Sequence, residues 1–353
     1  MTTTVGVRVR VRAGVRARAG VCACVWVRAR VRAFAVVLLA LGAAAGAVLG
    51  VASDDAGSAV PEVVFWVDPE SSAAQQAAEW RRTGRSADAL LMDRIATRAQ
   101  AEWLAGPGPR AVVEARTTAA AREGRTAVLV AYYIPHRDCG SHSGGGARSA
   151  ARYREWVDEF AAGLGDRSAY VIVEPDAVAQ TVAGCDRVVP EERYELLAYA
   201  VDRFKRQANT RVYLDGGNSA WHLDMSRLVE PLKESGIVRA DGFALNVSNF
   251  QTDAVSSAYG SKLSATLGDK PFVIDSSRNG NGPYTGTDSW CNPPGRALGV
   301  APTTVTGAPL IDAYLWVKRP GESDGTCRGG PSAGQWWPSY ALELASNARN
   351  ARK

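Results

Sequence analysis

Aspartate residues recur directly after short, mainly apolar runs of the sequence, where their carboxyl groups could serve acid–base chemistry. Asp138, Asp176 and Asp215 each follow such a run, and Asp275 and Asp324 stand near the ends of two later ones. If the runs are parallel strands, their carboxyl ends lie on one face of the fold and the carboxylates converge in one cleft. A single aspartate at such a place is as often a helix cap, so it is the recurrence that supports the hypothesis. Paired carboxylates can act as a general acid and a general base.

Other catalytic groups are scarce in this chain. It has three histidines, His136, His142 and His222, and none forms the His-x-x-x-His spacing of a helical metal site. The glycine-rich stretch Ser143–Gly146 lacks the Gly-Lys-Ser or Gly-Lys-Thr that ends a phosphate-binding loop. We therefore expect no metal and no cofactor, and a serine–histidine–aspartate triad has little support.

Tryptophan residues supply a second kind of candidate. A tryptophan is by default a core residue, as we expect for Trp80 and Trp156. Trp290, by contrast, lies in a stretch rich in Gly, Pro, Thr and Asn, where burial is difficult. Exposed aromatic faces suit the apolar faces of sugar rings, and carboxylates beside such platforms favour carbohydrate cleavage. The tryptophans near strand ends or in that stretch are Trp66, Trp221, Trp290 and Trp316.

Strand-like and helix-like segments alternate after residue 60, which predicts an α/β fold with a parallel sheet. About seven such units favour a distorted, incomplete (β/α) barrel that forms a single catalytic domain. Residues 278–312 are expected to form a long loop. The predicted strands are Val63–Val67, Ala127–Tyr133, Ala169–Val173, Thr210–Leu214, Gly242–Asn246, Pro271–Asp275 and Ala313–Lys318. The predicted helices are Ala73–Arg81, Thr117–Glu123, Ala147–Ala162, Glu191–Ala208, Met225–Ser235, Ala254–Leu267 and Tyr340–Ala348.

The beginning of the chain has the layout of a targeting segment. Eight arginines and no acidic residue lead to the uncharged run Phe34–Ala52, and small residues follow. This layout predicts a signal peptide and secretion, with an uncleaved membrane anchor and a downstream start codon as alternatives. The expected organisation is a signal peptide or anchor at 1–52, a short linker at 53–61 and the catalytic domain at 62–353.

The same segment accounts for the net charge of +5. The rest of the chain carries 33 basic and 36 acidic residues, so the domain itself is mildly acidic. Nothing in it suggests nucleic-acid binding, and DNA binding by the arginines of residues 1–32 is a weak alternative. We expect a monomer.

Four cysteines lie outside the targeting segment: Cys139, Cys185, Cys291 and Cys327. An even number of cysteines in an exported protein favours two disulfides over free thiols. Their spacing alone leaves all three pairings open.

Long blocks of the sequence match a known pattern. They include VAYYIPHRDCGSHSGGG from Val130, YVIVEPDAVAQ from Tyr170 and YLDGGNSAWH from Tyr213. Together these blocks resemble glycoside hydrolase family 6, the inverting cellulases, over residues 62–348. The resemblance implies an incomplete (β/α) barrel with a cleft or tunnel across its C-terminal face. Four further blocks agree in family order: GFALNVSNF from Gly242, FVIDSSRNGNGP from Phe272, SWCNPPGRALG from Ser289 and DAYLWVKRPGESDGT from Asp312.

The resemblance implies a role for each matching residue. Asp176 would be the general acid, and Asp138 would raise its pKa and help to position water. Asp324 would be the base, directly or through a water relay, and inversion would place acid and base roughly 6.5–9.5 Å apart. The substrate-binding residues would be Tyr132 at the cleaved sugar, Trp66, Trp221 and Trp290 as stacking platforms, Lys318 and Glu322 on sugar hydroxyls, and Arg137, Asp215, Asn246 and Asn249.

Two positions depart from the family pattern. Asn218 stands where the family usually has histidine, and Gly144 stands where many members place a serine that orients water. We expect altered affinity rather than inactivity. The resemblance also implies the disulfides Cys139–Cys185 and Cys291–Cys327.

The resemblance implies a secreted hydrolase of internal β-1,4-glucosidic bonds in cellulose or mixed β-glucan. The short Cys291–Cys327 span and the compact loop at 139–147 favour an open cleft and endo action. The alternative within the family is a cellobiohydrolase that releases cellobiose from chain ends. A non-catalytic glycan-binding protein is the alternative from another class, and the presence of both Asp138 and Asp176 argues against it.

Overall fold

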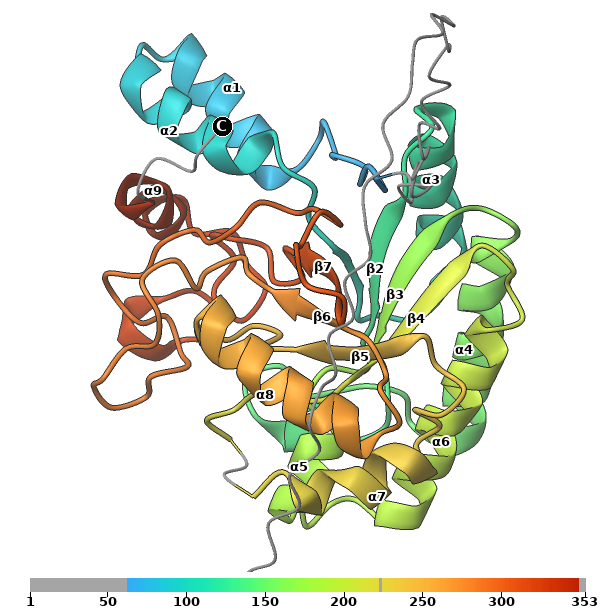
Figure 1. The fold of residues 1–353 in the computed structure, drawn as a ribbon. Helices are drawn as coiled ribbons and strands as arrows, with labels where there is room; N and C mark the ends of the chain where they lie inside the picture. Colours follow the sequence, from blue (N-terminus) through green and yellow to red (C-terminus); the bar gives the residue numbers. More distant parts are fainter. Residues whose placement is uncertain (1–61, 222–223, 349–353) are drawn as a thin grey trace, which may run out of the picture. The chain divides into compact units, whose positions relative to one another are not determined.

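The computed structural model describes residues 62–221 and 224–348. In this part of the chain seven parallel strands form one sheet, and each strand pairs with the next in sequence (Figure 1). The prediction of an α/β fold with about seven parallel strands is confirmed. The expected targeting segment and linker at 1–61 lie outside the described residues. The strands are β1 Glu102–Leu104, β2 Ala127–Ala131, β3 Ala169–Val173, β4 Thr210–Asp215, β5 Gly242–Leu245, β6 Phe272–Asp275 and β7 Ile311–Leu315.

Successive side chains of each strand point to opposite faces of the sheet, and both faces are covered. Val130 and Ile172 belong to an inner apolar cluster, whereas Leu129 and Val171 belong to an outer cluster beneath the helices. Every residue of β2 and β3 is buried. Burial on both faces explains why these strands read as continuous apolar runs in the sequence.

The helices divide into two groups. Most cover the outer face of the sheet, while α1, α2 and α9 form a third apolar cluster with Leu298 and Trp316 (Figure 1). Side chains cap some of them: Ser149 accepts from the N–H of Arg152 at the start of α4. Helices α2 and α5 were not predicted, and α5 has only seven residues. The helices are α1 Ser72–Arg82, α2 Ser86–Ala96, α3 Arg110–Arg122, α4 Ala150–Leu164, α5 Ala177–Ala183, α6 Pro190–Phe204, α7 Ser226–Glu234, α8 Asp253–Thr266 and α9 Pro338–Asn347.

The predicted strand Val63–Val67 is wrong. It is reduced to a single parallel bridge between Phe65 and Thr126, after which the chain leaves the sheet toward α1. The same edge of β2 is then continued by β1, since the N–H of Tyr132 donates to Leu104. The backbone N–H and C=O groups of successive residues point to alternate edges of a strand. Residues 126 and 132 are an even number apart, so their backbone groups point to the same edge of β2. With three residues, β1 was too short to be recognised in the sequence.

The barrel is incomplete, as expected. Within the described ranges no ladder joins β7 to β1. The two edges meet instead through single bonds, from Ala101 N–H to Trp316 O at 3.0 Å and from Trp103 Nε1 to Val317 O at 2.8 Å. These contacts close the ring only at the carboxyl end of β7.

A buried carboxylate organises the loops that follow the last strands. The side chain of Asp275, at the end of β6, accepts the backbone N–H groups of Ser248, Ser277, Val317 and Lys318. It thereby ties together the chain beyond β5, β6 and β7. The stretch between β6 and β7 contains no helix or strand, which confirms the predicted loop.

Two disulfides fasten loops of the fold. Cys139 is bonded to Cys185 and Cys291 to Cys327, the pairing that the resemblance implied. Among the residues that the structure describes, no helix has the length and apolar character needed to cross a membrane.

Candidate active site

Asp176 lies where the carboxyl ends of β3 and β4 meet. Its backbone N–H donates to Oδ2 of Asp215 at 2.9 Å, and the same oxygen accepts the N–H of Gly217 at 3.2 Å. Asp176 has the left-handed backbone angle φ 70°, and Glu174, just before the intervening proline, has φ 47°. Non-glycine residues adopt this conformation only where their surroundings enforce it, often at functional sites. The turn therefore places Asp176 beside a second, buried carboxylate.

This environment favours the protonated form of both groups. Burial raises the pKa of Asp176 well above its usual value, and the charges of Asp215 and Asp138 raise it further. Burial also raises the pKa of Asp215 to about 7, although the N–H bonds from Asp176 and Gly217 oppose the rise. Oδ1 of Asp215 has no hydrogen-bond partner in the described structure. That oxygen can carry the proton, because Oδ2 already accepts two bonds.

Asp138 faces this pair from the loop after β2. Its Oδ2 accepts the N–H of Ser143 at 2.7 Å, and its Oδ1 accepts Nε2 of Gln180 at 3.0 Å. Gln180 belongs to α5, the helix that Asp176 begins, so this bond joins the Asp138 loop to the Asp176 turn. The structure thus brings Asp138, Asp176 and Asp215 together, as predicted from their places at strand ends.

Tyr132 borders the same group of carboxyls. Burial raises the pKa of its hydroxyl well above the usual value, and the charges of Asp176 and Asp138 add to the effect. The hydroxyl therefore stays neutral and can donate a hydrogen bond. The ring of Trp103, on β1, meets the Tyr132 ring edge-on at 5.1 Å between centroids. Together they form an aromatic wall beside the carboxyls.

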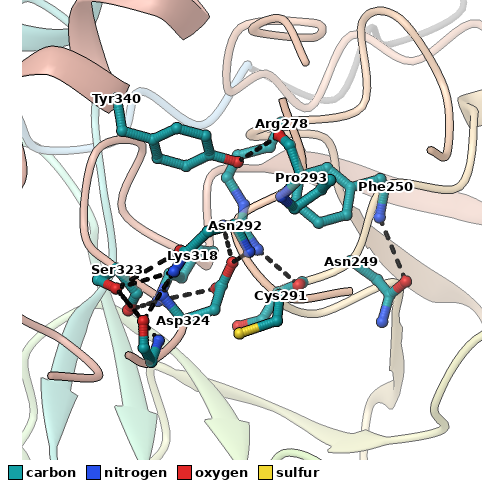
Figure 2. Close-up of polar contacts among 12 residues, drawn as sticks. Asn249, Phe250, Arg278, Cys291, Asn292, Pro293, Lys318, Ser323, Asp324 and Tyr340 are labelled. Atoms are coloured by element: carbon teal, nitrogen blue, oxygen red, sulfur yellow. Dashed lines mark hydrogen bonds and ion pairs between the residues drawn. The ribbon is translucent and has the colours of Figure 1, made fainter. Parts of the chain in front are cut away.

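Asp324 lies in a different kind of environment (Figure 2). Its Oδ2 accepts Nη1 of Arg278 at 2.8 Å and the N–H of Asn292 at 3.0 Å, while its Oδ1 lies 3.3 Å from Nζ of Lys318. Burial on its own would raise the pKa of Asp324, but the charges of Arg278 and Lys318 outweigh it and lower the pKa below the usual value. Asp324 is therefore held as a carboxylate.

Two of the predicted platform tryptophans present exposed faces. Trp290 is 45% exposed and Trp221 is 36% exposed, which is unusual for so large an apolar side chain. The ring of Trp290 lies 5.6 Å from that of His142, which belongs to the Asp138 loop. The exposure of both rings is compatible with the stacking roles predicted for these residues, which stay predictions. His222 lies outside the described residues.

Trp66 does not belong to this site, so its predicted stacking role is wrong. Its N–H donates to Thr126, at the amino end of β2, whereas the carboxyls lie beyond the carboxyl end. The ring is buried in the outer cluster, and its Nε1 donates to Glu123 at 3.0 Å. The predicted strand Val63–Val67 suggested that Trp66 stood near a strand end at the active face. Trp103, on the unpredicted β1, has the required location instead.

Two further predicted substrate contacts are also contradicted, because their polar atoms bind the protein's own backbone. The guanidinium of Arg137 donates to carbonyls of residues 105, 132, 143 and 144 and braces the Asp138 loop. Asn246 is fully buried, and its amide bonds to Gln251 and to the carbonyl of Asp275. Asn249, by contrast, is half-buried, and its position leaves its predicted role open.

The remaining predicted residues face different surroundings. Lys318 is buried and its Nζ donates to Ser323 O as well as pairing with Asp324. Glu322 instead pairs with Arg319 and lines a separate cavity of about 150 Å³ with Trp66. The predicted roles of Lys318 and Glu322 on sugar hydroxyls stay predictions.

The two departures from the family pattern have local explanations. Oδ1 of Asn218 accepts the N–H of Ala220 at 3.0 Å, so this side chain closes its own turn. A Cβ at Gly144 would lie 3.0 Å from backbone atoms of Gly140 and Ser141. A serine there would require the compact loop to shift.

Sequence reasoning missed four residues of the site. Arg278 and Gln180 stand inside the quoted blocks, but only the structure shows that they bind Asp324 and Asp138. Trp103 was hidden by the shortness of β1. Glu174 gave a signal, because it is a carboxylate directly before Pro175 and Asp176.

Comparison with known proteins agrees with this geometry. The family model of glycosyl hydrolases family 6 matches residues 60–348. The chain belongs to this family. Endoglucanase A of Cellulomonas fimi is 45% identical over 293 residues, and Endoglucanase 1 of Streptomyces halstedii is 42% identical over 292. The matches cover 82% and 79% of this chain, and 62% and 88% of those proteins. The chain thus spans about three fifths of the length of the Cellulomonas relative.

A solved structure shows the same fold. It is the endoglucanase Cel6 from Mycobacterium tuberculosis in complex with methyl-cellobiosyl-4-deoxy-4-thio-β-D-cellobioside. This chain resembles it with a TM-score of 0.75 and 44% identity over 81% of this chain and 97% of that one. The family and fold expected from the sequence blocks are confirmed.

The raised pKa of Asp215 predicts how the stability of this family 6 domain depends on pH. An acid whose folded pKa is about 7 binds more protons in the folded than in the unfolded state between about pH 4 and 7. Its contribution to stability is therefore lost as the pH rises through that window. We expect Asp215→Asn to flatten the fall of the unfolding free energy between pH 4.5 and 7.5, measured by urea denaturation. Glu195→Gln, at an exposed carboxylate, is the control, and an unchanged slope in Asp215→Asn would contradict the assignment.

Proposed function

We propose that this chain is an endo-acting hydrolase of β-1,4-glucosidic bonds in cellulose or mixed β-glucan, working by inversion. The observation that carries the proposal is the place of Asp176, whose N–H donates to Asp215 and whose pKa is raised by burial and by the charges of Asp215 and Asp138. Support comes from the relatives named endoglucanase at 42–45% identity. The mycobacterial endoglucanase holds a thio-linked cellobiosyl cellobioside, which supports a β-glucan as the substrate class here.

The proposed reaction divides the work among the carboxyls. Asp176 donates its proton to the glycosidic oxygen as the bond from that oxygen to the anomeric carbon breaks. Water attacks the anomeric carbon from the opposite face and loses a proton, which inverts the configuration. Asp138 keeps the pKa of Asp176 high while the acid is protonated and, in this proposal, orients the water. The neutral Tyr132 hydroxyl borders the sugar that is cleaved.

Asp324 is a poor immediate proton acceptor in this arrangement. Its oxygens are bound to Arg278, Lys318 and Asn292, and its lowered pKa makes it a weak base. These bonds support the relay form of the proposal, in which the proton of the attacking water reaches Asp324 or the solvent through other water molecules. The fixed negative charge of Asp324 would also stabilise positive charge that develops on the sugar.

One observation favours the alternative, a cellobiohydrolase. The loop that carries Asp138 touches the loop that follows Asp324: a Cβ at Gly325 would lie 2.5 Å from Nδ1 of His142. Loops in contact here would restrict the access of an internal stretch of glucan. The names of the relatives at higher identity favour the endo mode, since the relative named a probable exoglucanase is only 35% identical. We therefore retain endo action as the proposal.

The acid role of Asp176 predicts a specific loss. We expect Asp176→Ala to reduce kcat on barley β-glucan about 10²–10⁴-fold, because general acid catalysis is worth about that much. Proton NMR of the wild-type reaction should show the α-anomer first. Asp186→Ala, at an exposed aspartate nearby, should leave kcat unchanged. Initial release of the β-anomer would overturn inversion, and full activity in Asp176→Ala would overturn the acid role.

The mode of action is tested on carboxymethylcellulose. An endo enzyme cuts internal bonds, so viscosity falls steeply for each reducing end released. A chain-end enzyme releases reducing sugar with little loss of viscosity. Slow viscosity loss by the wild-type chain would favour the cellobiohydrolase over the endoglucanase.

We further propose that the protein acts outside the cell as a monomer. The arginine-rich and apolar beginning of the chain supports export, and two disulfides suit an oxidising compartment. Amino-terminal sequencing of the protein recovered from the culture medium should find a start near residue 53. Recovery of the full chain from membranes only would favour the anchor.

A further inference from the structure

Glu174 is a fully buried carboxylate that the proposed reaction does not use. It stands at the end of β3, and its side chain reaches across to the end of β2. Both of its oxygens lie 3.0 Å from the N–H of Tyr133, and Oε2 accepts the N–H of Ile134 at 3.1 Å. These N–H groups come after the last ladder pair of β2, so the side chain takes the place of a strand partner.

Arg193 holds the next part of the same segment. This buried residue of α6 donates from Nη2 to the carbonyl of Pro135 at 2.8 Å. The carbonyl of Tyr133 accepts the N–H of Ala147 at 2.8 Å, from the far end of the loop. The backbone of residues 133–136 is thus fixed from β3, from α6 and from its own returning loop. We call Glu174 and Arg193 the buried clamp.

The clamped segment connects Tyr132 to Asp138. At its last residue, His136, and beyond it at Asp138 and Cys139, the backbone is left-handed, with φ between 49° and 54°. Such angles persist only where neighbouring bonds enforce them. Glu174 also stands two residues before Asp176 and is itself left-handed. One residue therefore governs both the acid and the loop that carries its partner carboxylate.

We propose that Glu174, together with Arg193, is a positioning residue that fixes Asp138 and Tyr132 relative to Asp176. The proposal rests on the proposed function, because it assigns the clamp to the geometry of that reaction. A displacement of about 1 Å in a catalytic group can cost about 10²-fold in rate. The groups that face the Glu174 carboxylate are the guanidinium of Arg193 and the hydroxyl of Tyr153 on α4. A glutamine would set an NH₂ group against the N–H groups that the carboxylate accepts.

Glu174→Gln is the first test. We expect kcat on soluble β-glucan to fall about 10–100-fold while KM changes by less than about threefold, since the substrate platforms are untouched. The basic limb of the pH profile should move to lower pH. The limb moves to lower pH because the charge of Asp138 raises the pKa of Asp176. Once the loop shifts Asp138 away, that pKa falls. Arg193→Lys keeps the positive charge, so kcat and the basic limb of the pH profile should change in the same direction but by less.

Asp241 offers a matched control. Its carboxylate accepts the N–H of Val212 at 2.7 Å and pairs with Lys205, the residue that ends α6. Asp241→Asn therefore removes the same type of contact at the amino end of the sheet. Both variants should lower the melting temperature, and only Glu174→Gln should change kcat and the pH profile. A purely structural Glu174 would behave like Asp241, and that result would overturn the proposal.

Amide hydrogen exchange tests the clamp without catalysis. In Glu174→Gln, peptides covering residues 132–146 should exchange faster, while those covering 205–215 exchange at the wild-type rate. In Asp241→Asn, peptides covering 205–215 should exchange faster and those covering 132–146 should be unchanged. Faster exchange together with an inactive wild-type chain would refute the proposed function and leave the clamp standing. Unchanged exchange over 132–146 in Glu174→Gln would overturn the clamp even if the wild-type chain hydrolyses glucan.

Discussion

The hydrogen bond from the backbone of Asp176 to the carboxylate of Asp215 determines the arrangement of the site. It forms because β3 and β4 pair in register up to Val173 and Leu214, which puts both strand ends at one level. The bond brings a second carboxyl group beside Asp176 without a cation between them. Like-charge repulsion and burial then keep a proton in the pair. A single backbone contact therefore sets the chemistry of the acid.

The same residue type has three different electrostatic environments within one face of the barrel. Asp215 is buried with two N–H donors, Asp176 is partly buried beside other carboxyls, and Asp324 is buried between two cations. The pKa is raised in the first two and lowered in the third. Side-chain identity alone cannot separate a proton donor from a fixed negative charge. The neighbours that decide it come from distant parts of the chain, such as Arg278, which is 46 residues before Asp324.

The sequence was most informative where one local signal decided the structure. The apolar runs of β2 and β3 identified buried strands, and the family blocks located Asp138, Asp176 and both disulfides. Prediction failed where the outcome depended on partners. Trp66 and Trp103 are both tryptophans near a strand, and only the pairing of β1 with β2 shows which one lies against Tyr132. Arg137 and Asn246 look suited to bind sugar, yet their polar atoms are taken by backbone groups, among them the carbonyls of residues 105 and 275.

The third apolar cluster joins the first and last helices of the described chain. Arg94 of α2 donates to the carbonyls of Ala345 and Ala348, more than 250 residues away in sequence. Leu344 and Ala345 of α9 complete the cluster that α1 and α2 begin. Contacts of such long range form late, because the intervening chain must first be ordered. During synthesis on the ribosome, part of the apolar surface of the α1–α2 pair therefore remains exposed to solvent until α9 has emerged.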